Sequence, residues 1–422
     1  MQKGFMLGAS TAAYQVEGNN IYSDFWTIEQ LPHTSFTEPS GDAVDHYNRF
    51  EEDIRLLKEA GLNAYRFSIE WARIEQEKGV FSAEETEHYR QVLSACHKNG
   101  VKPIVTLHHF SSPKWLIEEG GWENPKVVDY FSRYCAYIAE QLGEQMEYVC
   151  TINEANMRLQ MSAIVRMFAK AMGINLQVGV KMELPEEYQV GQKEECEAFG
   201  GIDAVNTFLT ACTPEGDILI MKAHEAARRA MKEKCPHLKI GLTLSLHDIQ
   251  AADGGEEYAQ EQWDEEFAHY LPYLQEDDYI GVQNYTRMLA GPGAELPVPE
   301  DAKKTQMGYE FYPQAMGHVV RRVAQECSLP ILITENGVAT GDDEDRVAFI
   351  ETVLRDLYAA KKDGVPLLGY LHWSLFDNFE WQQGYAKTFG LIAVDRTTQV
   401  RTPKPSLYTI AEIWNKLNEQ AT

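Results

Sequence analysis

The chain lacks any apolar run long enough to span a bilayer, and its opening residues, MQKGFMLGASTAAYQVEG, lack the apolar core of a secretory signal peptide. Basic residues are scarce, with 38 lysines and arginines against 64 aspartates and glutamates. The formal net charge of −26 repels nucleic-acid phosphates and anionic lipid, so we expect neither nucleic acid nor a membrane as a partner. A neutral or cationic small molecule stays open as the ligand; alternatively, the acidity serves only solubility.

The cysteines lack the spacing of a disulfide framework or a zinc site. None of the seven forms a Cys-x-x-Cys pair, and their number is odd. Reduced, buried thiols are typical of a cytoplasmic protein, and we expect that location here. Any substrate must then enter the cell or arise inside it. Internal repeats, low-complexity tracts and linkers are also missing, so residues 1–422 are predicted to form one domain.

Short apolar segments alternate with helical patterns along the chain, which is typical of βα units around a parallel sheet. The predicted strands are the eight segments Phe5–Gly8, Ala64–Ile69, Pro103–Leu107, Tyr148–Ile152, Lys239–Leu244, Tyr279–Gln283, Ile331–Thr334 and Leu367–Leu371. Eight strands close this type of barrel. The predicted fold class is therefore α/β, a single-domain (β/α)8 TIM barrel with elaborated βα loops.

Capping signals and loop lengths divide the segments between the strands. Helix N-termini are predicted at Ser82, Asn124, Asp217 and Glu344. Residues 155–215 and 286–312 are too long for minimal βα units. Since long βα loops gather at the carboxyl-terminal face of a barrel, both are predicted to border the substrate mouth. The alternative is that they are solvated elaborations without contact to a substrate.

Two predicted strands run into a glutamate. The fourth ends in Thr-Ile-Asn-Glu at Glu154, and the seventh in Ile-Thr-Glu-Asn-Gly around Glu335. Glycoside hydrolysis needs two carboxyl groups on either side of one bond, one protonated to assist the leaving oxygen and the other ionised. A single glutamate at a strand end is usually a surface or salt-bridge residue, so the pair is only suggestive until its flanking residues are considered.

Those flanking residues belong to an ordered set of motifs. FMLGASTAAYQVEG, AYRFSIEWARI, TLHHF, TINEAN, ITENG and WSLFDNFEW follow one another from Phe5 onward. The chain thereby resembles glycoside hydrolase family 1, the β-glucosidase and β-galactosidase family, from Phe5 to about Leu407. The resemblance implies a retaining β-glycosidase without a cofactor that acts on a small-molecule β-glycoside. Glucose, galactose and fucose stay open as the sugar, and the aglycone and the oligomeric state are not implied.

The resemblance also implies roles for single residues. Glu154 would be the acid/base and Glu335 the nucleophile. Arg66 would keep Glu335 ionised, because a nearby positive charge favours a carboxylate. Tyr285 would donate a hydrogen bond to the same carboxylate, and Asn153 would bind the sugar 2-hydroxyl. The matching sugar-binding positions are Gln15, His109, Gln283, Trp373, Glu380 and Trp381.

Adjacent histidines, His108 and His109, raise the alternative of a metal site. Neighbouring strand residues point to opposite faces, and no second ligand pair is evident, so we expect no metal. Further alternatives are a catalytically inactive binding domain, a glycosidase for 6-phosphorylated sugars, and a thioglucosidase. Both carboxylates are retained, which disfavours an inactive binding domain. The Glu380-Trp381 pair disfavours a glycosidase for phosphorylated sugars, and a glutamate at position 154 disfavours a thioglucosidase. Transglycosylation stays open for any retaining enzyme.

Some residues depart from the family pattern. Ala155 replaces a proline, Phe110 a tryptophan, and Thr388 stands where a basic residue is frequent. Gln283 replaces a frequent asparagine, and its longer side chain is expected to reach further into the site or toward the aglycone.

Several geometric expectations follow. Asn153 and Glu154 are both needed in one site, which predicts an irregular backbone there. The family implies a cis peptide at Trp373–Ser374. Retention predicts carboxyl groups about 5–5.5 Å apart, whereas inversion would need about 6.5–9.5 Å. Glu335 should be ionised at neutral pH, and Glu154 should stay protonated longer.

Overall fold

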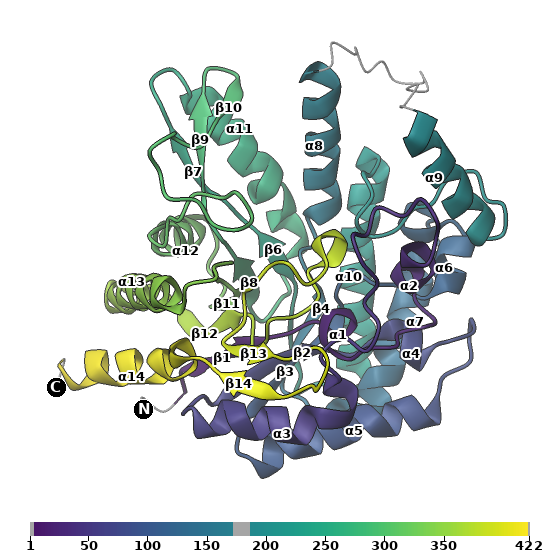
Figure 1. Cartoon of the computed structure of the whole chain (residues 1–422), viewed down its shortest axis with the longest axis horizontal. Coiled ribbons are helices and arrows are strands. Elements are labelled where there is room, and N and C mark those ends of the chain that lie inside the picture. The colour runs from purple at the N-terminus through teal and green to yellow at the C-terminus, as the bar shows by residue number, and fades with distance from the viewer. Residues whose placement is uncertain (1–3, 172–185, 421–422) are drawn as a thin grey trace.

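A ring of parallel strands forms the centre of the molecule in this computed structural model, which describes residues 4–171 and 186–420 (Figure 1). Its strands are β1 (Met6–Ser10), β2 (Ala64–Ser68), β3 (Lys102–His108), β4 (Tyr148–Ile152), β5 (Lys239–Gly241), β6 (Thr243–Ser245), β8 (Ile280–Gln283), β11 (Ile331–Glu335) and β12 (Leu367–Trp373). They pair in the order β5-β4-β3-β2-β1-β12-β11-β8-β6. The predicted (β/α)8 barrel is thereby confirmed.

The fifth barrel position differs from the prediction, because Lys239–Leu244 is not one continuous strand. β5 pairs with β4 and β6 pairs with β8, and only Leu242 separates them. The break lets one segment turn from one neighbour to the other and so close the ring. Most other predicted strands agree with the structure to within one or two residues at each end.

Amphipathic helices surround the ring. The longer ones are α3 (His46–Glu59), α5 (Ala83–Lys98), α7 (Val127–Leu142), α10 (Pro214–Lys234), α11 (Glu256–Glu266), α12 (Ala315–Glu326), α13 (Asp343–Lys362) and α14 (Pro405–Glu419). Ser82 caps α5 as predicted, by accepting the Glu85 N–H. The predicted start at Asp217 is wrong, since Thr213 caps α10 and Pro214 is its first residue. Asn124 lies in the turn before α7 rather than at its N-cap.

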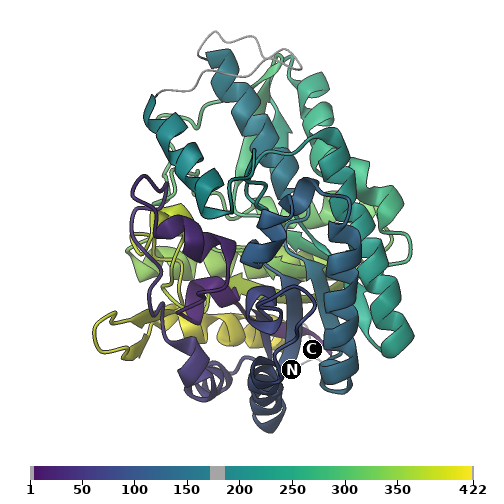
Figure 2. The same ribbon diagram turned by 90° about the vertical axis from the view of Figure 1, so that its right-hand side faces the viewer.

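Two insertions rise from one side of the ring. The first holds α8 (Met157–Ala171) and α9 (Glu186–Ala198), and the predicted segment 155–215 also includes residues outside the described ranges. The second is a small sheet in the order β10-β9-β7, from β7 (Asp248–Ala251), β9 (Arg287–Gly291) and β10 (Ala294–Leu296). Both views place α8 and this sheet above the ring on the same side (Figure 1, Figure 2).

Shorter helices and a hairpin connect these parts. They are α1 (Ala13–Val16), α2 (Asp24–Glu29), α4 (Trp71–Ile74), α6 (Lys114–Glu118) and the hairpin of β13 (Ile392–Val394) with β14 (Arg401–Pro403). No helix within residues 4–171 and 186–420 is both long and apolar enough to cross a membrane.

Apolar packing closes the amino-terminal end of the barrel. A buried cluster takes residues from strand starts around the ring, including Met6, Ala64, Ile104 and Leu332. A much larger core lies between the strands and the surrounding helices. Because these strands are buried on both faces, their sequences are nearly continuous apolar runs. Polar side chains inside the ring are therefore concentrated toward its carboxyl-terminal end.

Candidate active site

The two glutamates predicted to act together line one cleft at the carboxyl-terminal end of the ring. Glu154 lies two residues after the end of β4 and is 6% exposed, while Glu335 ends β11 and is 3% exposed. The cleft has a volume of about 390 Å³. Two buried carboxyl groups in one cleft cannot both ionise freely, so their neighbours decide which one carries the charge.

The backbone around Glu154 is irregular, as predicted. Glu154 has a φ of +44°, a conformation that non-glycine residues rarely adopt. Its N–H donates to Thr243 Oγ1 at 2.8 Å, and the Ala155 N–H donates to the Thr243 carbonyl at 2.9 Å. Thr243 on β6 therefore holds the turn that brings Asn153 and Glu154 into one site. The predicted cis peptide at Trp373–Ser374 is also present.

Glu335 receives a direct hydrogen bond at each carboxylate oxygen. Arg66 Nη1 donates to Oε1 at 2.7 Å, and Tyr285 Oη donates to Oε2 at 2.7 Å. The other terminal nitrogen of Arg66, Nη2, donates to Asn153 Oδ1 at 2.6 Å. Arg66 is fully buried on β2, so one cation ties together groups from three strands. These contacts place Arg66 and Tyr285 beside Glu335, and Asn153 beside Arg66.

Burial raises the pKa of both glutamates, but their neighbours separate them. The Arg66 charge and the hydrogen bonds from Tyr285 and Arg66 lower the pKa of Glu335 against that rise. Burial and the charge of Glu335 hold the pKa of Glu154 well above its usual range. Proton sharing therefore favours a protonated Glu154 beside an ionised Glu335.

The predicted sugar-binding residues surround the glutamates from other loops. His109, Trp373, Glu380 and Trp381 line the cleft. Gln15 is fully buried and donates through Nε2 to the Phe379 carbonyl at 2.6 Å and to Glu380 Oε2 at 3.4 Å. Burial and the Glu335 charge raise the pKa of Glu380 to about 8.

Aromatic rings fix the positions of these residues. The Trp381 ring stacks on Tyr14 with centroids 5.8 Å apart, and the His109 ring stacks on Trp373 at 5.6 Å. Burial and nearby Arg66 lower the pKa of His109, so its imidazole is neutral. His108 points the other way, and its Nε2 lies 2.9 Å from Ser112 Oγ. Among the described residues, no three His, Cys, Asp or Glu side chains are grouped to hold a metal ion.

Gln283 reaches into the site and not toward the aglycone, the other direction expected for it. Its side chain is fully buried, and Nε2 donates to Asn153 Oδ1 at 2.8 Å and to Thr243 Oγ1 at 3.0 Å. The extra methylene is therefore used inside the ring, next to Asn153, and does not extend toward the aglycone. The reason is that Asn153 offers a carbonyl oxygen already oriented by Arg66.

The other departures lie at the edge of the site. Thr388 donates through Oγ1 to the Thr340 carbonyl at 2.8 Å, which links two loops. Phe110 lines the cleft with a φ of +69° and brings no polar atom to it. The sequence alone did not identify two further residues of the site, Thr243 and Ser245. The Ser245 hydroxyl hydrogen-bonds Glu154 and favours the ionised form of that carboxyl group. Met157, Ile164, Leu209 and Met307 line the cleft from the two segments, 155–215 and 286–312, that the sequence predicts to border the substrate mouth.

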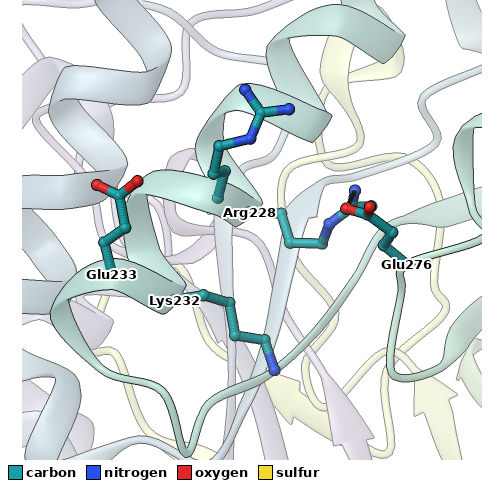
Figure 3. A pocket seen from close by; sticks show the side chains of 5 residues that line it. Arg228, Lys232, Glu233 and Glu276 are labelled. Atoms are coloured by element: carbon teal, nitrogen blue, oxygen red, sulfur yellow. Dashed lines mark hydrogen bonds and ion pairs between the residues drawn. The ribbon is translucent and has the colours of Figure 1, made fainter.

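A second hollow of about 340 Å³ lies on α10 and is lined by charged residues (Figure 3). Arg228 Nη2 donates to Glu276 Oε2 at 2.8 Å, and Lys232 Nζ lies 2.7 Å from Asp278 Oδ2. These acidic partners directly precede β8, at the end of the ring opposite the glutamates. Both of these cations are thus paired within the protein, and the chemistry of the molecule is concentrated in the cleft.

Comparisons with known proteins agree with this geometry. The model of glycosyl hydrolase family 1 matches residues 1–287 and 266–419. β-Glucosidase A of Thermotoga maritima is 28% identical over 97% of each chain. A 6-phospho-β-galactosidase of Clostridium acetobutylicum is 27% identical over 97% of this chain and 96% of its own. The crystal structure of the β-glycosidase BGL167 superposes with a TM-score of 0.89 and 41% identity, covering 100% of this chain and 98% of the other.

Proposed function

Because this chain belongs to glycosyl hydrolase family 1 and is a β-glycosidase, we propose that it removes terminal β-linked glucose from small glycosides with retention of configuration. The observation that carries this proposal is the pair of hydrogen bonds that Arg66 and Tyr285 donate to Glu335 across the cleft from Glu154. The glucosidase relatives support glucose as the sugar, and galactose or fucose are tested beside it.

In the first step, Glu335 attacks the anomeric carbon and forms a glycosyl ester. Glu154 gives its proton to the glycosidic oxygen, and the aglycone leaves. The Glu335 charge is then consumed by the new bond, which removes the main charge that raises the pKa of Glu154. Glu154 becomes a base, takes a proton from water, and the hydroxide replaces Glu335 on the anomeric carbon. Two inversions leave the sugar in its original β configuration.

Asn153 would support this chemistry by binding the 2-hydroxyl group of the sugar. Its Oδ1 already accepts hydrogen bonds from Arg66 and Gln283. Its Nδ2 is buried and has no partner among the described residues. We assign Nδ2 to the sugar 2-hydroxyl, a contact that strengthens as positive charge develops at the anomeric carbon.

Glu380, Gln15, His109, Trp373 and Trp381 would bind the remaining hydroxyls and the apolar face of the sugar. A 6-phosphorylated sugar would need a cation, since phosphate is bound by Arg or Lys. No Lys or Arg lines the described part of the cleft, and a carboxyl group, Glu380, stands at the expected position. The unphosphorylated β-glucoside should therefore have the higher kcat/KM.

The same proposal places one catalytic domain in the cytoplasm, without a cofactor. All seven cysteines are free, and four of them are buried. Burial raises the pKa of Cys96 to about 12, so its thiol stays protonated and unreactive.

Azide rescue tests the two roles. Glu154→Ala should keep the first step for substrates with good leaving groups, and added azide should then give the β-glycosyl azide. Glu335→Gly with azide should give the α-glycosyl azide, because the small anion attacks from the vacated nucleophile side. Nuclear magnetic resonance of the products distinguishes the anomers. If the anomers are exchanged, the glutamates have been assigned in reverse, and an inactive wild-type enzyme on all aryl β-glycosides would reject the proposal.

A further inference from the structure

The leaving-group half of the cleft is lined mainly by apolar side chains. They are Met157, Ile164, Leu209, Leu246 and Met307, which we name the apolar wall. We propose that this wall selects an alkyl or aryl aglycone over a second sugar. The proposal rests on the function given above and specifies its substrate class.

The position of α8 identifies this wall as the leaving-group side. The helix begins three residues after Glu154, the group that protonates the departing oxygen. Met157, Gln160 and Ile164 all line the cleft, and their spacing of three and four residues places them on one helix face. From Met157 to Ile164 the helix rises about 10 Å. An aglycone whose oxygen is protonated by Glu154 would therefore extend along this face of α8.

Two polar side chains on this side are turned toward the protein. Gln160 Nε2 donates to the Ser245 carbonyl at 2.9 Å, and Thr286 Oγ1 donates to the Glu310 carbonyl at 2.9 Å. His247 Nδ1 lies 2.6 Å from Glu266 Oε1, and its other ring nitrogen has no hydrogen-bond partner among the described residues. The Tyr309 phenol also lines the cleft. These few polar groups suit an aglycone with one or two polar atoms better than a sugar with several hydroxyls.

Physical chemistry gives this wall opposite effects on the two kinds of aglycone. A second glucose would lose water from its hydroxyls without gaining equivalent partners, which is unfavourable. An alkyl chain or aromatic ring gains free energy from each apolar group that it buries. Ile164 is 47% exposed in the free protein and so has apolar surface available to be covered.

A series of n-alkyl β-glucosides from methyl to octyl tests the proposal, because leaving-group chemistry hardly changes while apolar surface grows. We expect kcat/KM to rise about twofold per methylene, where full burial would give about fourfold. Octyl β-glucoside should also exceed cellobiose, although its alkoxide is the poorer leaving group. A flat series together with a preference for cellobiose would overturn the proposal.

Two neighbouring residues of α8 provide a matched pair of variants. Ile164→Gln changes the apolar wall and should reduce the gain per methylene by at least one third. Val165→Gln makes the same kind of change at a residue that is 38% exposed and does not line the cleft, so its series should equal that of the wild type. Equal slopes for all three proteins would contradict the assignment. An enzyme inactive on every β-glucoside would instead reject the proposed function.

Discussion

At the scale of single residues, Arg66 determines how the amide of Asn153 is oriented. A guanidinium group only donates hydrogen bonds, so the atom 2.6 Å from Nη2 must be the Asn153 oxygen. The same oxygen lies 2.8 Å from Gln283, which must therefore present its NH2 group. Asn153 is left with its own NH2 for the sugar, and Gln283 is a positioning residue for that contact.

Gln283→Glu places an oxygen against the Asn153 oxygen and should disturb this orientation. We expect the ratio of kcat/KM for a β-glucoside over its 2-deoxy analogue to fall about tenfold, the effect of roughly one lost hydrogen bond to a sugar hydroxyl. Gln283→Asn keeps an amide and should preserve more of the ratio. If either variant instead changes aglycone preference while this ratio stays constant, the positioning role is wrong.

At the scale of elements, the break between β5 and β6 brings Thr243 next to Glu154, the proposed acid/base. Its hydroxyl accepts the Glu154 N–H at 2.8 Å, and this contact supports the positive φ at Glu154. A strained residue of this kind keeps its conformation only when its surroundings hold it. Thr243 therefore orients the carboxyl group of Glu154, and it is not needed to keep Glu335 ionised.

Thr243→Val preserves the side-chain shape and removes the hydroxyl. We expect about a tenfold loss of kcat/KM for aryl glucosides with poor leaving groups, and little loss for those with good ones, because only the former depend on the proton from Glu154. A plot of log kcat/KM against leaving-group pKa should become steeper. Thr243→Ser keeps the hydroxyl and should retain the wild-type slope; a uniform loss across the plot in Thr243→Val would indicate general damage.

The elements also show how far the sequence predicts this molecule. Strands such as Tyr148–Ile152 are predictable because burial on both faces requires an uninterrupted apolar run. The irregular backbone at Glu154 is predictable because two adjacent residues must face one site. The break at Leu242 has no local signal, since it follows from closing the ring. The start of α10 does have a local signal, because Pro214 directly follows its N-cap, Thr213.

The site divides in a similar way. Glu154, Glu335, Arg66 and Tyr285 are identifiable because ordered motifs surround them. The buried position of Gln283 is not, because it depends on an Asn153 oxygen supplied by another strand. Ile164 and Met307 resemble ordinary surface residues in sequence, and only the folded arrangement brings them to one cleft.

At the scale of the whole molecule, Glu380 should make stability depend on pH. Burial raises its pKa from an ordinary 4.5 to about 8, so the folded chain holds a proton that the unfolded chain releases. This contribution is complete below pH 4.5 and is lost as the pH rises through 8. Glu380→Gln carries no such proton. From pH 5 to pH 8 the variant should gain on the order of 3 kcal/mol in unfolding free energy relative to wild type.

Denaturant unfolding of both proteins at the two pH values measures this difference. The comparison with wild type cancels the other buried acids, such as Glu70, whose pKa burial raises to about 7. A constant offset between the two proteins at both pH values would show that Glu380 is ionised in the folded state throughout this range.

The catalytic groups and the apolar wall belong to different parts of the chain. Glu335 and Arg66 lie on strands of the ring, and Glu154 lies two residues after one. Met157 and Ile164 lie on α8, and Met307 lies in a loop beyond β10. A change in the wall therefore need not move the carboxyl groups. Natural variation or laboratory recombination of these insertions can therefore change which leaving groups are accepted. The strands that carry the carboxyl groups stay the same, so relatives can share one reaction and differ in the aglycone that they release.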